Sequence, residues 1–212
     1  MIITHHGAEF FKVSFGDITL AFNPISKAST LKQTRFGADI ALISLEHLDM
    51  NGVEQVMHNG KEPLVVRGPG EYEKNDILIK GYPTSSHYGG VELINTAYLV
   101  TLERMNLLFL GAIDTKELPT DLKEALDKID ILFVPIGGEG VFEPDDAHAF
   151  AVSVEPKIVI PTHYGGVGRK DALDLFLKEG GLTKGDANIT EKLTIKARDL
   201  DDKQNEIVVF AS

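Results

Sequence analysis

The amino-acid sequence predicts a single mixed α/β domain that spans residues 1–212. The first half of the chain consists of short apolar runs separated by turn residues, which is typical of β-strands. In the second half, apolar strands alternate with amphipathic helices. No linker, repeat or low-complexity stretch divides the chain, and 212 residues with a hydrophobic fraction of 43% are enough for one buried core.

The first half is expected to open with a β-meander. Its three strands are predicted at residues 2–4, 10–15 and 18–22, and Gly16-Asp17 forms the turn between the last two. Further strands are predicted at residues 38–43, 63–66, 77–79, 96–102 and 106–110, with a weakly helical segment at 53–57. The run Gly68-Pro69-Gly70 is interpreted as a tight turn.

The second half is expected to supply the helices. They are predicted at residues 118–128, 144–154 and 171–178, with strands at 131–135 and 158–160. The segments 193–197 and 207–210 are predicted to form a terminal hairpin or strand pair.

Composition and charge narrow the classes of function. The chain has no cysteine, which excludes disulfides, thiolate metal sites and a cysteine nucleophile. Its formal net charge of -11 and the lack of a basic cluster argue against nucleic acid as a partner. No apolar run approaches the roughly 20 residues that span a membrane, so no membrane partner is expected. The first residues carry no signal-peptide pattern, and we expect a cytoplasmic protein. The oligomeric state is left open.

Four polar side chains are candidates for a metal site. His47 and Asp49 lie two residues apart just past a buried strand, where an extended backbone turns both side chains the same way. His87 and His163 each follow a predicted strand. Taken separately, each of these residues also suits a surface, capping or hydrogen-bonding role, because a metal needs three or more ligands.

Six segments of the chain occur in the order that metallo-β-lactamase-fold proteins show. These segments are ISLEHLDMNG, GPGEYE, SSHYGG, LFLGA, VPIGG and IVIPTHYG. The chain resembles this superfamily over nearly its whole length, and it is most similar to the small hydrolases that resemble ascorbate-6-phosphate lactonase. The resemblance implies a four-layer αββα fold, with two sheets between outer helices and metal ligands gathered from loops along one edge.

The chain departs from the family's ligand pattern at several positions. The motif THxHxDH falls on residues 44–50, which keeps His47 and Asp49 but places Leu45 and Met50 at two histidine positions. His87 and His163 match later ligands. The aspartate of the family's LGD motif falls on Ala112, and relatives often carry histidine at the position of Ala8. Asp114, two residues after Ala112, either substitutes for that aspartate or begins a turn.

The remaining ligands favour one metal ion over two. A two-metal centre would have two protein ligands per ion, which is below the usual minimum of about three. His47, Asp49, His87 and His163 could instead close around one zinc or other divalent ion.

Two functions follow from this ligand set. The first is a hydrolase that activates water against an ester, lactone or phosphodiester of a small-molecule substrate, with Asp49 or Glu46 as the base. The second is a metal-free, non-catalytic descendant that acts as a binding or interaction module.

The consecutive residues His5 and His6 point to opposite faces of a strand and are assigned to structure or surface.

Overall fold

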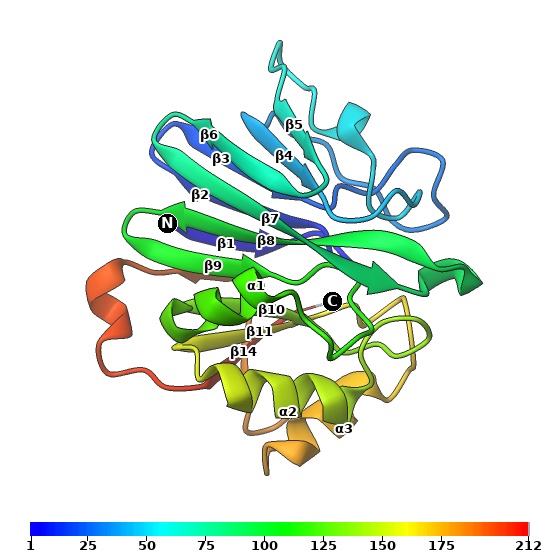
Figure 1. The fold of residues 1–212 in the computed structure, drawn as a ribbon, viewed down its shortest axis with the longest axis vertical. Helices are drawn as coiled ribbons and strands as arrows, with labels where there is room; N and C mark the ends of the chain where they lie inside the picture. Colours follow the sequence, from blue (N-terminus) through cyan, green and yellow to red (C-terminus); the bar gives the residue numbers. More distant parts are fainter. Residues whose placement is uncertain (212) are drawn as a thin grey trace.

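The computed structural model describes residues 1–211 and contains two β-sheets that face each other (Figure 1). The six-stranded sheet has the order β13-β1-β2-β3-β4-β5, and the eight-stranded sheet has the order β12-β14-β11-β10-β9-β8-β7-β6. The predicted α/β sandwich with two facing sheets is confirmed.

The six-stranded sheet is built mainly from the N-terminal third. Its strands are β1 (Ile2–His5), β2 (Phe11–Phe15), β3 (Ile18–Phe22), β4 (Ile40–Ile43), β5 (Leu64–Arg67) and β13 (Lys192–Thr194). The first three form the predicted antiparallel meander, and β4 and β5 continue the sheet in parallel.

The eight-stranded sheet has an antiparallel half and a parallel half. The antiparallel strands are β6 (Gly70–Lys74), β7 (Ile77–Ser86), β8 (Leu93–Leu102) and β9 (Met105–Phe109). The parallel strands are β10 (Ile131–Pro135), β11 (Ile158–Thr162), β14 (Glu206–Phe210) and β12 (Asn188–Thr190). Because these strands are parallel, the loops that follow them begin at the same edge of the sheet.

The α-helices all cover the eight-stranded sheet. The helices α1 (Thr120–Ala125), α2 (Pro144–Val154) and α3 (Ala172–Glu179) bury apolar side chains against its outer face. The 3-10 helices are η1 (Val53–Gln55), η2 (Tyr88–Gly90), η3 (Leu126–Lys128) and η4 (Ala197–Leu200). Helix α2 has the bounds that the sequence predicts, with a proline in its first turn and two acidic residues near its positive end.

The layer outside the six-stranded sheet differs from the expected pattern. Within residues 1–211 it contains no α-helix, and the apolar cluster there joins the sheet to the loop after β3 and to the residues that flank η1. The two sheets bury a separate core between them, in which the rings of Phe11 and Phe22 lie 5.1 and 5.9 Å from the ring of Phe133.

Three predictions about elements were wrong. The segments 193–197 and 207–210 do not pair with each other, because β13 pairs with β1 whereas β14 lies between β11 and β12 in the other sheet. Gly70 is the first residue of strand β6, whereas the sequence analysis placed it in a tight turn. Strand β7 extends to Ser86, well beyond the predicted end at residue 79. None of the helices in the described part of the chain is long and apolar enough to cross a membrane.

Candidate functional site

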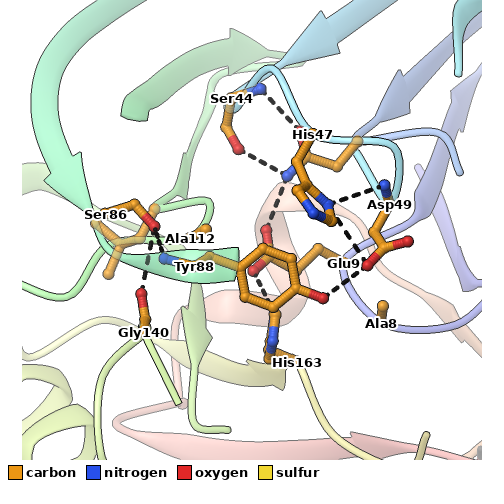
Figure 2. A network of polar contacts seen from close by, with 12 residues as sticks. Ala8, Glu9, Ser44, His47, Asp49, Ser86, Tyr88, Ala112, Gly140 and His163 are labelled. Carbon is orange, nitrogen blue, oxygen red and sulfur yellow. Dashed lines mark hydrogen bonds and ion pairs between the residues drawn. The ribbon is translucent and has the colours of Figure 1, made fainter. Parts of the chain in front are cut away.

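The candidate ligands come from loops that follow three different strands. His47 lies after β4, His87 directly after β7, and His163 directly after β11. Because these strand ends meet at one edge of the sandwich, the loops bring side chains that are far apart in the sequence into one region, as Figure 2 shows.

His163 and Glu9 form a buried pair at the base of this region. The Nδ1 atom of His163 lies 2.8 Å from Oε1 of Glu9, and neither side chain is exposed to solvent. The amide nitrogen of the Asn23 side chain donates to Oε2 of Glu9 at 2.8 Å. The Nε2 atom of His163 is buried and has no hydrogen-bond partner within residues 1–211. A carboxylate that holds one ring nitrogen while the other stays free is the usual arrangement of a metal-binding histidine.

His47 and Asp49 form a second group on the opposite side of the region. The Nδ1 atom of His47 lies 3.5 Å from Oδ2 of Asp49 and accepts a hydrogen bond from the Asp49 backbone amide at 3.2 Å. The other carboxylate oxygen of Asp49 accepts a hydrogen bond from the Ser29 hydroxyl. The Tyr88 hydroxyl donates to Oδ2 of Asp49 at 2.7 Å. Burial, with this hydrogen bond as the second cause, raises the pKa of Tyr88 far above its usual value, so the phenol stays protonated.

Tyr88 fills the space between these two groups. Its ring centroid lies 4.8 Å from that of His47 and 4.8 Å from that of His163, with both imidazoles edge-on to the ring. Figure 2 shows the tyrosine ring between the two histidines. An apolar cluster beside the ring contains the three residues that the resemblance aligns with family ligands. Its members are Leu45, Met50, Ala112 and Val141, with Tyr88 and Leu93 packed against them.

The structure does not bring His87 to the other candidate ligands. The Oδ2 atom of Asp114 accepts a hydrogen bond from the His87 backbone amide at 2.9 Å and also contacts Nδ1 of its ring. The hydrogen bond and the charge of Asp114 raise the pKa of His87, whose side chain is 57% exposed. The carboxylate of Asp114 therefore positions His87.

Glu46, one of the two candidate bases, points to a different set of partners. It forms an ion pair with Arg67 and accepts a hydrogen bond from the Asn51 side chain at 3.1 Å. Partial burial raises the pKa of Glu46, but the Asn51 hydrogen bond and Arg67 outweigh burial and hold the pKa below its usual value. A carboxylate that is paired in this way is a poor proton acceptor near neutral pH.

The residues do not fit a divalent ion in this conformation. Across residues 1–211, no group of three His, Asp or Glu side chains is placed to hold one. His163 is oriented as a ligand, but the amide of Asp49 donates to Nδ1 of His47, which puts the ring proton of neutral His47 on Nε2. Tyr88 separates these two imidazoles.

Several residues around Glu9 adopt a left-handed backbone conformation. The φ angles are 49° for Ala8, 43° for Asn23 and 61° for His163. Such angles are uncommon for residues other than glycine and cost about 1–3 kcal/mol each. Asn23 and His163 contact the buried carboxylate of Glu9, and Ala8 precedes it in the chain.

Sequence reasoning missed Glu9 and Tyr88. Glu9 precedes the apolar pair Phe10-Phe11, so an acidic residue in an otherwise buried segment was the available signal. Nothing in the sequence indicated a special role for Tyr88, because it follows His87 in a glycine-rich turn and resembles an ordinary loop residue.

The chain matches a known protein family over most of its length. Residues 2–163 match the family described as the beta-lactamase superfamily domain. The chain belongs to this family, and the resemblance to metallo-β-lactamase-fold proteins is confirmed.

Two curated relatives of the chain are named as metal-dependent hydrolases. A UPF0173 metal-dependent hydrolase of Listeria monocytogenes is 25% identical over 197 residues, which cover 77% of this chain and 85% of the relative. A UPF0173 metal-dependent hydrolase of Lysinibacillus sphaericus is 27% identical over 196 residues, with the same coverage of both chains.

Solved structures support the same fold. A Thermotoga maritima protein of the metallo-beta-lactamase superfamily has a TM-score of 0.73 and 23% identity, and the match covers 99% of this chain and 97% of that one. A metallo hydrolase from Ignicoccus hospitalis has a TM-score of 0.60 and 19% identity, with 92% of this chain and 99% of that chain covered.

Proposed function

We propose that the chain is a hydrolase of the metal-dependent class that holds at most one divalent ion, and that the conformation described above is its closed form. The observation that carries the proposal is the imidazole of His163, which Glu9 holds through Nδ1 while Nε2 is buried without a partner. Membership of the beta-lactamase superfamily and the names of the curated relatives support it. We further propose zinc as the ion and the cytoplasm as the location.

Removal of the Tyr88 ring from its present place would leave three donor groups facing one space. These are the imidazole of His163, the carboxylate of Asp49 and, once the Asp49 amide no longer donates to its Nδ1, the imidazole of His47. Three such donors meet the usual minimum for zinc. The turn that carries Tyr88 contains Gly89 and Gly90 with φ angles of 79° and 80°, so its backbone has access to conformations closed to other residues. In this class, a divalent ion supplies an activated water for attack on an ester, lactone or phosphodiester.

Of the two candidate bases, Asp49 is the better placed. It lies beside the Tyr88 ring and accepts the phenol hydrogen bond, whereas Glu46 is held by Arg67. His87 is placed outside this centre, where its ring and Asp114 line the surface.

Hydrolysis assays test the proposal. Wild type and His163→Ala are offered aryl esters, lactones and bis(aryl) phosphodiesters, each with added zinc or manganese and with a chelator. We expect metal-dependent hydrolysis by the wild type and a loss of roughly 100-fold or more in His163→Ala, as is typical when a supporting or ligating group of a metal site is removed. His58→Ala, which changes an exposed histidine, serves as the control. Equal rates for all proteins, with and without chelator, would contradict the proposal.

A specific observation favours a second candidate, a metal-free binding or interaction module. The positions of two family histidines and of the family aspartate are filled by Leu45, Met50 and Ala112, which are buried together against Tyr88. An apolar cluster of this kind stabilises the closed conformation without any ion. The same assays separate the candidates, because a module of this kind shows no metal-dependent rate.

A further inference from the structure

A cavity of about 300 Å³ lies next to the candidate metal centre but is lined by different residues. Ala8 belongs to its wall, and the Ala8 carbonyl accepts hydrogen bonds from the His163 amide at 3.0 Å and from the ring of His5 at 3.2 Å. The volume is at the lower end of the range typical for small-molecule sites, about 300–1,000 Å³.

Among residues 1–211, the polar side chains of the cavity wall include a cation and no acid. Lys32, His5, His6 and Thr34 line it, and no aspartate or glutamate does. Lys32 forms no ion pair within residues 1–211. In a chain with a formal net charge of -11, a cavity with an unpaired cation and no acid is an unusual local environment.

The rest of the wall is apolar or backbone. Ile25, Leu31 and Val167 provide aliphatic surface. Gly165 and Gly166 also line the cavity, and their amides donate no hydrogen bond within residues 1–211. The cavity wall therefore combines apolar side chains, a lysine cation and unpaired backbone amides. A small ligand that carries an acid group on a compact apolar body matches this combination.

Both histidines of the wall are held neutral. Burial, followed by the charges of His5, Lys12 and Lys32, lowers the pKa of His6 to about 4, and burial lowers the pKa of His5. At neutral pH these rings add hydrogen-bonding groups but no charge, so Lys32 is the cation of the cavity wall.

We propose that this cavity binds a small organic anion, a carboxylate or phosphate carried on a compact apolar body, with Lys32 as its counter-ion. The apolar wall formed by Ile25, Leu31 and Val167 would hold the body of the ligand. The proposal stands apart from the hydrolase activity, because it requires neither a metal nor the displacement of Tyr88.

Binding is tested on the full chain with benzoate, phenyl phosphate and benzamide, the last as the uncharged control. Chemical shifts of backbone amides are followed while each compound is titrated. Benzoate or phenyl phosphate is expected to bind at least tenfold more tightly than benzamide, and the largest shifts are expected at His6, Gly165 and Gly166. The tighter of the two acids identifies the acid group.

Two variants make the test specific. Lys32→Gln is expected to weaken binding of the acid at least tenfold, whereas Lys27→Gln, an exposed lysine in the same loop outside the cavity wall, leaves it unchanged. Val167→Trp is expected to fill the cavity and abolish binding with the rest of the amide spectrum preserved. Binding that is equal for acid and amide, equal in wild type and Lys32→Gln, or centred elsewhere overturns the proposal.

Discussion

A carboxylate and an imidazole share a fully buried hydrogen bond at the base of the site. Glu9 and His163 have no exposed side-chain surface, and within residues 1–211 the only other side-chain hydrogen bond of the pair is the one that Asn23 donates to Glu9. Polar groups at such depth depend on their hydrogen bonds, so the loss of one partner leaves a buried donor or acceptor unsatisfied.

Glu9→Gln is therefore expected to lower the free energy of unfolding by about 2 kcal/mol, measured by urea denaturation. The substitution keeps the shape of the side chain but places an amide NH2 group where a carboxylate oxygen contacts Asn23 or His163. Glu139→Gln, at an exposed position in a nearby loop, is the matched control and should change stability by less than about 0.5 kcal/mol. Equal stability of the two variants would show that the buried pair is not a constraint on the fold.

The second residue-scale prediction concerns pH and His6. Burial, with the charges of His5, Lys12 and Lys32, lowers the pKa of His6 from 6.5 to about 4 in the folded state. Between these values the unfolded chain binds a proton that the folded chain does not, so the free energy of unfolding falls as the pH drops from 6.5 toward 4. His6→Gln removes this part of the pH dependence.

Urea midpoints measured across this interval check the prediction. The slope of stability against pH should be smaller for His6→Gln than for wild type, and His58→Gln at an exposed position should follow the wild type. Identical slopes for all three proteins would mean that His6 titrates alike in the folded and unfolded states.

The site residues show which part of the chemistry the sequence could predict. His47, Asp49 and His163 stand in motifs, and their loops follow strands that meet at one edge, so their gathering in one region followed from topology. The place of Tyr88 could not be predicted, because it depends on the rotamer of one side chain in a turn and on the packing around it.

Elements with strong local signals were predicted well, and elements defined by distant partners were not. Helix α2 has a proline at its start and a left-handed residue, Glu155, after its end, and its bounds match the prediction. Strand β6 has a mostly exposed sequence and lies at the edge of its sheet, so it lacks the apolar alternation by which strands are found. Strands β13 and β14 belong to different sheets, and η4 lies between them in the chain. The local sequence pattern does not indicate which sheet each strand joins.

The turn that carries Tyr88 depends on a close approach of the loop after β10. A Cβ atom on Gly140 would lie 2.6 Å from the backbone of His87 and Tyr88, and the φ angle of Gly140 is 101°. Gly140→Ala is therefore expected to lower the free energy of unfolding by about 3 kcal/mol, through both strain and overlap. The overlap should also push the Tyr88 turn away from its present place.

Gly60→Ala is the matched control for this element. Gly60 also has a positive φ angle, 75°, but nothing lies within 4 Å of an added Cβ. The backbone strain alone costs about 1–2 kcal/mol. If urea titrations give Gly140→Ala and Gly60→Ala the same free energy of unfolding, the loop after β10 does not hold the Tyr88 turn.

At the scale of the whole molecule, the chain has the fold of its superfamily, but the candidate metal centre at the strand edge differs from the ligand pattern that the family resemblance implies. The two facing sheets and the strand edge that collects loops are those of the beta-lactamase superfamily. At that edge, the apolar residues that the resemblance aligns with three family ligands pack together, and the ring of Tyr88 lies between His47 and His163. The central claim is that this ring controls whether an ion is bound.

Calorimetric titration of the metal-free protein with zinc tests this claim most directly. Wild type and Tyr88→Phe, which keeps the ring, are expected to bind at most one zinc ion per chain and weakly. Tyr88→Ala is expected to bind one zinc ion at least tenfold more tightly, because the donors of His47, Asp49 and His163 then face one space. The added substitution His163→Ala should abolish the gain. Two tightly held zinc ions in the wild type, or equal affinity in wild type and Tyr88→Ala, would contradict the account.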